Sequence, residues 1–132
     1  MAVTSVGELH ERLPARPHSV PVVRRAVGDF AAGCGASARQ LSAITLAVSE
    51  AVSNAVIHAY VGHHDPGDVA VQARVSGRML QVTVCDEGIG MRPRVDSPGA
   101  GLGLGLLASA ADSLELAEMS PGVRVRMTFD IG

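Results

Sequence analysis

The clearest periodic pattern lies between residues 37 and 61. Apolar residues recur there at spacings of three and four, which is the period of a helix that buries one face. They are Leu41, Ile44, Val48, Ala51, Ala55 and Ala59. Ser37 and Gln40 have the spacing of a capping box, and no glycine or proline interrupts the run up to Val61. The pattern predicts one long helix that begins at Ser37.

A shorter helix is expected before this one. Ser19 is its predicted N-cap, and Pro21 lies in the first turn, where proline is tolerated. Apolar residues follow at helical spacing, and the helix is expected to end near Gly33 or Gly35. Upstream, a weak alternation within residues 1–14 predicts one short strand.

Alternating apolar and polar residues predict strands through most of the second half of the chain. The alternating segments are residues 69–75, 80–84, 114–116 and 123–129. A hairpin turn is expected at 76–78, and a helix at 102–111 after a loop with prolines and glycines. The predicted order is strand, helix, helix, strand, strand, loop, helix, strand, strand. It indicates an α+β two-layer sandwich, with helices on one face of a mixed, mainly antiparallel sheet.

Composition narrows the class of protein. The chain has 132 residues, which is enough for one domain over residues 1–132 with one core. Hydrophobic residues make up 47% and charged residues 18%, as in an ordinary soluble globular protein. Aromatic residues make up 2% and the formal net charge is −2. Nucleic-acid binding is therefore not expected, because it relies on aromatic stacking and positive charge.

Targeting and metal-binding signals are weak. No run approaches the ~20 apolar residues of a membrane helix, and the N-terminus lacks the pattern of a signal peptide, so we expect a cytoplasmic protein. Cys34 and Cys85 are too few for a disulfide framework or a CxxC zinc site, so we expect two reduced thiols. Histidines near Asp65 could suggest a metal site, although loop histidines beside a turn are usually solvated. They are His58, His63 and His64.

A line of polar residues is unusual on the long predicted helix. Glu50, Asn54 and His58 are spaced by four and therefore project from one side. Spacing alone also fits a solvent-exposed face. Against that alternative, Glu50 is the one acidic or basic residue, histidines aside, between Arg39 and Asp65. A carboxylate and an amide on a helix patterned for burial need partners, so the line is a candidate ligand site.

A second candidate comes directly after the strand predicted at 80–84, the pentapeptide Asp86-Glu87-Gly88-Ile89-Gly90. Glycines at alternate positions let the backbone turn sharply and let a flat ligand approach where a Cβ would obstruct it. An ionised aspartate accepts hydrogen bonds only, which suits an exocyclic amino group such as that of adenine. A plain turn also favours aspartate and glycine, and for the pentapeptide alone this alternative stays open.

A third candidate is the glycine run Gly99-Ala100-Gly101-Leu102-Gly103-Leu104-Gly105. Backbone N–H groups of such a run can point at an anion, and the helix expected after it adds its positive N-terminal end. The run is not a P-loop, which needs Lys-Ser/Thr where this chain has Leu106-Leu107. It also departs from the dinucleotide fingerprint, and on its own it fits a flexible turn.

In this order the three candidates resemble the nucleotide-binding boxes of the GHKL ATPases, which share the Bergerat, or histidine-kinase-like, ATP-binding fold. SEAVSNAVIHAY (49–60) resembles the N box, DEGIG (86–90) the first glycine box, and GAGLGLGLL (99–107) the second. The resemblance covers nearly the whole chain. It is nearest to a small stand-alone branch, the anti-sigma-factor serine kinases of bacterial partner-switching systems, in which Glu-x-x-x-Asn and His-Ala-Tyr occur together.

The resemblance implies ATP and Mg²⁺ as cofactors and a role for each matching residue. Glu50 would be the general base that takes the proton from an attacking hydroxyl. Asn54 would coordinate Mg²⁺, which offsets the charge of the phosphates. Asp86 would accept from the adenine amino group, in a pocket shaped by Gly88 and Gly90.

Two further roles follow from the same resemblance. Gly101, Leu102 and Gly103 would offer backbone contacts to the phosphates. Arg24 lies six residues before Phe30, as does an arginine that meets protein partners in this branch. A homodimer formed through the N-terminal strand region is also implied.

Two departures from the family pattern bear on activity. Residues 91–98 form only a short ATP lid, in which Arg92 and Arg94 could reach the γ-phosphate or could be a solvated charge pair. Relatives often carry Gly-Thr where this chain has Gly122-Val123. Val123 cannot supply the hydroxyl that usually helps to hold the adenine end.

The implied function is that of an ATP-dependent serine kinase in transcription regulation. It would phosphorylate a STAS-type anti-anti-sigma factor, releasing ADP, and would also bind a sigma factor. A second hypothesis is a regulatory module of the same fold that holds ATP or ADP and acts by protein binding only. A third is a nucleotide-independent interaction domain, which Mg-ATP would not stabilise.

Overall fold

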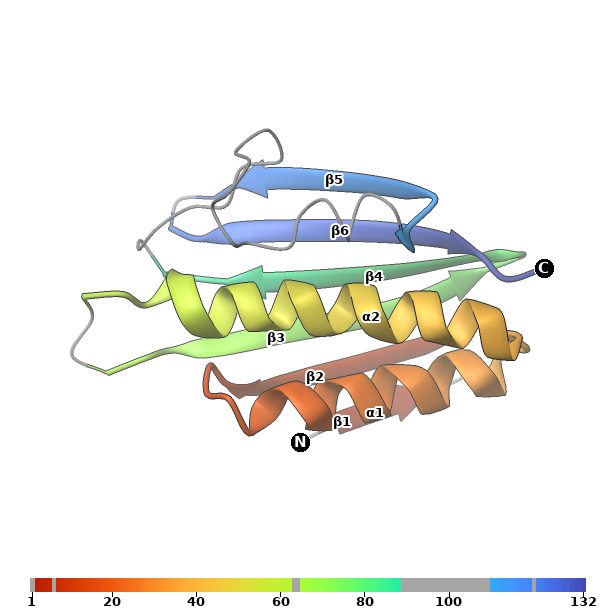
Figure 1. Cartoon of the computed structure of the whole chain (residues 1–132), viewed down its shortest axis with the longest axis horizontal. Helices are drawn as coiled ribbons and strands as arrows, with labels where there is room; N and C mark the ends of the chain where they lie inside the picture. The colour runs from red at the N-terminus through yellow and green to blue at the C-terminus, as the bar shows by residue number, and fades with distance from the viewer. Residues whose placement is uncertain (1, 6, 63–64, 89–109, 120) are drawn as a thin grey trace.

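Two helices cover one face of a six-stranded sheet (Figure 1). The computed structural model describes residues 2–5, 7–62, 65–88, 110–119 and 121–132. The strands are β1 Ala2–Ser5, β2 Glu8–Pro14, β3 Asp68–Ser76, β4 Met79–Asp86, β5 Ser113–Glu118 and β6 Val123–Asp130. The helices are α1 Ser19–Gly33 and α2 Ala38–Asn54, and α2 continues into a π-helical segment, η1 Ala55–Ala59.

The sheet has the strand order β1-β2-β3-β4-β6-β5, and every pairing among the described strands is antiparallel. β4 and β6, which are separated in sequence by β5, are neighbours inside the sheet, with Asp86 opposite Val123 at one end. The α+β two-layer fold expected from the sequence is confirmed. The helix expected at 102–111 lies almost wholly outside the described residues.

The core lies between the sheet and the helices. α1 packs on β2 and β3, and α2 packs on β4 and β6. Alternate residues of the strands face the helices, as the period of two requires. Fully buried members of this layer include Val27, Ile44, Val48, Val69, Val82 and Met127. Aliphatic side chains and Met127 fill the core with very few aromatic rings, in keeping with the composition.

The N-terminal segment differs from expectation. One strand was predicted within residues 1–14, and the structure has two, β1 and β2, paired as antiparallel neighbours. Gly7 lies between them at φ +83°, a left-handed conformation that glycine adopts without strain. The single-strand prediction is wrong because the reversal occupies too few residues to interrupt the alternation of apolar positions.

The start of α1 also differs. Ser19 is not the N-cap, because it is already the first helical residue and His18 precedes it without a side-chain capping bond. The Ser19 hydroxyl instead donates to the Pro14 carbonyl oxygen at 2.6 Å, which ties the helix to the end of β2. The capping box of α2 is confirmed, since the Gln40 N–H donates to Ser37 Oγ and Gln40 Oε1 accepts from the Ser37 N–H.

The long helix is long and apolar enough to cross a membrane, although no membrane helix was expected from the sequence. Residues Ala38–Ala59 form 22 helical residues with a mean hydropathy of 1.3, enough in length and composition to cross a membrane. Its inner face, which includes Ile44, Val48 and Val52, is fully buried in the core of this fold. The apolar character of the helix is therefore accounted for by packing on the sheet.

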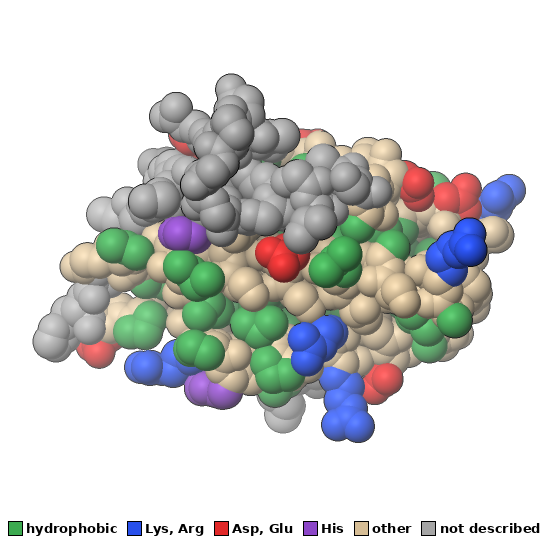
Figure 2. Space-filling view, in the orientation of Figure 1, with side chains coloured by type: hydrophobic (Ala, Val, Ile, Leu, Met, Phe, Trp, Pro, Cys, Tyr) green, Lys and Arg blue, Asp and Glu red, His purple; other side chains and the backbone are tan. Residues whose placement is uncertain are grey.

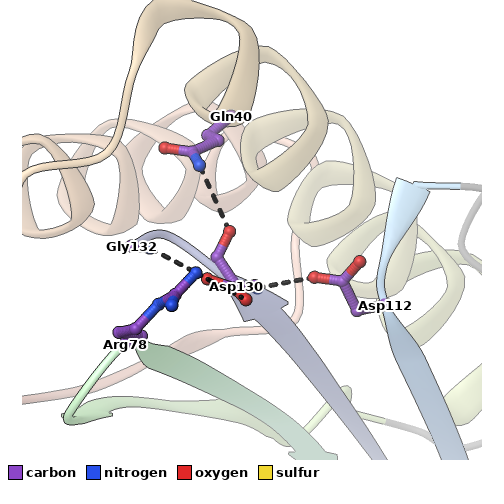
Figure 3. Close-up of polar contacts among 5 residues, drawn as sticks. All are labelled: Gln40, Arg78, Asp112, Asp130 and Gly132. Atoms are coloured by element: carbon purple, nitrogen blue, oxygen red, sulfur yellow. Dashed lines mark hydrogen bonds and ion pairs between the residues drawn. The ribbon is translucent and has the colours of Figure 1, made fainter.

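A polar cluster closes the end of the molecule where α2 begins (Figure 3). The Gln40 side-chain amide donates to the Asp130 carbonyl oxygen at 3.2 Å, so the capping-box residue also holds the end of β6. Arg78 pairs with the Asp130 carboxylate at 3.4 Å, and the Asp130 N–H donates to Asp112 at 2.5 Å. This cluster joins α2, the β3–β4 turn and both C-terminal strands.

Candidate functional site

The candidate site lies at the opposite end of α2, where η1, the end of β4 and the start of β6 meet. A small cavity there is lined by residues that are distant in sequence. They are Ala51, Asn54, Ala55, Ala59, Val84, Asp86, Gly88, Val123 and Val125. The fold therefore brings Asn54 of the predicted N box to the same cavity as Asp86 and Gly88 of the predicted first glycine box.

Asn54 carries an unused polar group into this cavity. Its side chain is 8% exposed, and its Nδ2 has no hydrogen-bond partner in the described part of the chain. A buried amide without a partner costs about 1–3 kcal/mol, so this nitrogen is a candidate contact for a ligand. Because Asn54 is buried, the line of Glu50, Asn54 and His58 is not simply a solvent-exposed face of the helix.

Glu50 and His58 flank Asn54 by one helical turn on either side and are both partly exposed. Neither lines the cavity between η1 and the sheet. The Glu50 carboxylate lies on the same helix side as Asn54, so it is available to a group that enters from outside the cavity.

Asp86 is the last residue of β4. Its Oδ1 accepts a hydrogen bond from the Gly88 N–H at 3.0 Å, a local turn that directs the chain away from the sheet. Register places Asp86 between Val69 of β3 and Val123 of β6. The carboxylate is thus held at the end of a central strand, beside the cavity that Asn54 enters.

Gly88 is packed directly against the helix end. A Cβ at this position would lie 1.9 Å from the Ala59 carbonyl oxygen and 2.4 Å from the Ala59 carbonyl carbon. No larger residue fits there without displacing backbone. η1 is a π-helical turn, a type frequently found at functional sites, and its last residue, Ala59, supplies this contact.

Gly122 makes the equivalent contact from β6. A Cβ on Gly122 would lie 1.9 Å from the Asp86 carbonyl oxygen, and its φ of +107° already favours glycine. Val123, the next residue, is 6% exposed and lines the cavity. The structure therefore places Val123, where the family resemblance leads us to expect a threonine, opposite Asp86.

Several predicted site residues lie outside the described part of the chain. They are Gly90, Gly101, Leu102 and Gly103, the arginines Arg92 and Arg94, and the histidines His63 and His64. Their roles stay predictions. Arg24 is described and is exposed on α1.

Among the described residues no cluster of three His, Cys, Asp or Glu side chains could hold a metal ion. A magnesium ion bound with a nucleotide needs fewer protein ligands, because it keeps waters and binds phosphate oxygens. The unpartnered Asn54 amide fits such a role, because the amide oxygen and nitrogen can exchange places by a flip.

A larger hollow of about 440 Å³ lies elsewhere, over β2, β3 and β4. It is lined by His10, Glu11, Arg12, Ala70, Val71, Gln72, Thr83 and Cys85. None of the predicted site residues borders it, so its size does not make it the candidate site.

Cys85 and Cys34 are free thiols, and burial raises the pKa of the Cys85 thiol.

Sequence reasoning missed Tyr60, the single tyrosine of the chain. Its hydroxyl donates a hydrogen bond to the Asp68 carbonyl oxygen at the start of β3 and accepts one from the Glu87 N–H just after β4. The one signal available was its place in the His-Ala-Tyr sequence, which carried the family resemblance without indicating a role.

Comparison with known proteins agrees with the geometry. Residues 13–129 match the family model described as the histidine kinase-like ATPase domain, and the chain belongs to this family. Its fold and its helix–strand site define the same class of nucleotide-binding protein.

Within that class the chain is similar to bacterial anti-sigma factors and serine kinases. It is 35% identical to the anti-sigma F factor of Thermoanaerobacter sp. (strain X514), over all of this chain (100%) and 98% of that protein. It is 30% identical to the serine-protein kinase RsbW of Bacillus pumilus (strain SAFR-032), over 94% of this chain and 86% of the kinase.

A solved structure has the same fold. The crystal structure of the RsbU and RsbW domains of a Mycobacterium tuberculosis protein superposes with a TM-score of 0.75 at 23% identity. The match covers 94% of this chain and 32% of the solved one, so the present chain corresponds to about a third of that protein.

Proposed function

We propose that the chain is an ATP-dependent serine kinase that phosphorylates a STAS-type anti-anti-sigma factor and also binds a sigma factor. The observation that carries the proposal is the cavity between η1, β4 and β6, which is lined by both Asp86 and Asn54, the latter with an amide nitrogen that has no partner among the described residues. The names of the similar anti-sigma F factor and serine-protein kinase support the choice of activity.

The residues divide the work by position. Asp86 binds the adenine amino group, and Gly88 lets the turn after β4 pack closely on the backbone of Ala59. Asn54 holds Mg²⁺, which offsets phosphate charge when it is bound with the nucleotide. Glu50, one turn earlier on the same helix side, takes the proton from the attacking serine hydroxyl. The serine oxygen then carries the γ-phosphoryl group, and ADP is the leaving product.

Partner binding is assigned to surfaces outside the cavity. Arg24 is exposed on α1 and is proposed to contact the protein partners. Figure 2 shows exposed hydrophobic side chains over the helical face, among which Val22, Leu46, Ile57 and Val61 are 44–59% exposed. We further propose a cytoplasmic location, and a homodimer formed through the N-terminal strands.

Glu50→Gln tests the kinase assignment, because it keeps the size of the side chain and removes the proton acceptor. Phosphoryl transfer from ATP to a cognate anti-anti-sigma factor should fall at least ~100-fold, the usual scale for loss of a general base. Affinity for ATP, measured by calorimetric titration, should stay within about threefold, because Glu50 does not line the cavity. Undiminished transfer by the variant would refute the base assignment.

A second candidate is a module that binds ATP or ADP and acts by partner binding alone. Val123 favours it, because a buried valine beside Asp86 offers no hydrogen bond to the base. This candidate predicts that wild type and Glu50→Gln bind the partner equally and that neither phosphorylates it.

A further inference from the structure

Tyr60 joins three segments at the candidate site. It directly follows η1, and its hydroxyl donates to the Asp68 carbonyl oxygen at the start of β3, at 2.7 Å. The same hydroxyl accepts a hydrogen bond from the Glu87 N–H at 3.1 Å. One oxygen atom thus links the helix end to β3 and to the backbone just after β4.

The Tyr60 ring is held by close packing. A Cβ on Gly67 would lie 2.8 Å from each of three Tyr60 atoms, namely Cε1, Cζ and the hydroxyl oxygen. Gly67, just before β3, therefore packs directly against this side chain. On the other side Ala59, the residue before Tyr60, contacts Gly88 through its backbone. The position of the hydroxyl is therefore set by packing of its own ring and of the preceding residue.

Glu87 is the residue between Asp86, the proposed adenine ligand, and Gly88, which packs on the backbone of Ala59. The Asp86 carboxylate already accepts from the Gly88 N–H, which shapes the turn from within. The bond from the Glu87 N–H to Tyr60 holds the same turn from outside. The two hydrogen bonds together restrict the direction in which the Asp86 side chain leaves β4.

We propose that Tyr60 is a positioning residue that holds the turn 86–88 in the conformation that binds the adenine ring. The inference rests on the proposed function, since it assumes that Asp86 receives the base. Tyr60 itself is not among the residues that line the candidate cavity. It raises affinity by keeping the binding-competent turn populated before the ligand arrives.

Water cannot replace the connection that the Tyr60 hydroxyl makes between Asp68 and Glu87. Water can satisfy the Glu87 N–H and the Asp68 carbonyl separately at little cost, so loss of the hydroxyl should leave overall stability nearly unchanged. A water molecule does not tie the turn to a packed ring. Burial raises the pKa of Tyr60 above its ordinary value, so the hydroxyl stays a neutral donor throughout the physiological range.

Tyr60→Phe tests the proposal, because it keeps the ring against Gly67 and removes only the hydroxyl. The control is Thr45→Val, which removes a hydroxyl of α2 that donates to the Leu41 carbonyl oxygen at 2.8 Å, away from the site. Dissociation constants for ATP and ADP with magnesium are measured by calorimetric titration. The KM for ATP and kcat are measured with the cognate phosphoacceptor.

We expect Tyr60→Phe to weaken binding of both nucleotides and to raise the KM for ATP about tenfold, with kcat within twofold of wild type. Thr45→Val should change none of these values. The Glu87 amide, followed by NMR hydrogen exchange without nucleotide, should exchange about tenfold faster in Tyr60→Phe alone.

Two results would overturn the proposal. One is nucleotide affinity equal to that of wild type, and the other is unchanged exchange of the Glu87 amide. Failure of the proposed function is seen separately, as absence of ATP binding or of phosphoryl transfer in the wild-type protein. In that case the amide exchange still decides whether Tyr60 holds the turn.

Discussion

At the residue scale, Val123 is the position where the sequence is expected to depart from the family pattern. It lies opposite Asp86 in the β4–β6 register, is buried, and lines the candidate cavity. A hydroxyl at this place would add one hydrogen bond to the adenine end of a bound nucleotide. Under the proposed function, wild type is expected to bind ATP more weakly than a variant with a hydroxyl at this position.

Val123→Thr should strengthen ATP binding. A new hydrogen bond contributes about 0.5–1.5 kcal/mol net, which corresponds to a two- to tenfold lower dissociation constant in calorimetric titration. The control is Val125→Thr, because Val125 is equally buried on the same face of β6 but lies opposite Val84 instead of Asp86. Equal affinities for wild type and Val123→Thr would place the adenine end elsewhere.

Glu11 is a second residue with an unusual environment. It is 7% exposed in β2 between exposed His10 and Arg12, and its Oε2 has no hydrogen-bond partner among the residues the structure describes. Burial raises its pKa above the ordinary value of 4.5. The folded state therefore favours the protonated carboxyl more than the unfolded state does, and ionisation of Glu11 destabilises the fold.

The pH dependence follows with a definite sign. The stability associated with protonated Glu11 is complete below about pH 4.5 and is lost as pH rises through the raised folded pKa. Glu11→Gln should therefore be more stable than wild type at pH 7 in urea unfolding, and the difference should vanish near pH 4. Glu118→Gln, at an exposed position of β5, is the control and should show no such gain. A gain that persists at low pH would contradict the assignment.

At the element scale, α2 connects the polar cluster around Asp130 with the candidate site. Its N-terminus is capped by Ser37 and Gln40, and its C-terminal continuation η1 forms one wall of the site. Gln40 also holds the Asp130 carbonyl, so the cap is joined to β6 (Figure 3). The helix that presents Asn54 is thus anchored at Gln40, about four turns before Asn54.

Two substitutions of Gln40 distinguish the stability that comes from its hydrogen bond with Ser37 from that of its hydrogen bond with Asp130. Gln40→Ala loses the cap acceptor and the contact with Asp130, and should lower the free energy of unfolding by about 1–2 kcal/mol in urea titration. Gln40→Glu keeps an acceptor for the Ser37 N–H and loses only the donor to Asp130, so its loss should be smaller. Equal losses in the two variants would show that the cap contributes nothing.

Element prediction from the sequence succeeded where a local pattern was strong. The capping box, the hairpin at Gly77 and the alternating strands β3, β4, β5 and β6 are all confirmed. The π-helical turn η1 was not predictable, because apolar spacing continues through Ala55 and Ala59 as it would in an α-helix. The tertiary contact between Ala59 and Gly88 accompanies that turn, and no local signal encodes it.

At the scale of the whole molecule, the sheet order explains how the candidate site is assembled. β4 and β6 are neighbours although β5 lies between them in sequence, and α2 crosses both. Asn54, Asp86 and Val123 therefore meet at one end of the central strands. The sequence order of the boxes predicted the class of site, whereas the contacts of Tyr60, Gly88 and Gly122 required the assembled fold.

The central claim is that Mg-ATP binds at the cavity bordered by Asn54 and Asp86. Thermal unfolding with and without Mg-ATP, on wild type and Asp86→Asn, tests it most directly. Asparagine keeps one oxygen for the Gly88 N–H and replaces the other by an amino donor, which cannot accept from adenine.

Wild type should gain roughly 2.7 kcal/mol of stability at a ligand concentration one hundred times the dissociation constant. Asp86→Asn should gain little or nothing at the same concentration, with an unchanged melting temperature in the absence of nucleotide. A wild-type melting curve that Mg-ATP leaves unmoved, or an equal gain in Asp86→Asn, would contradict the account.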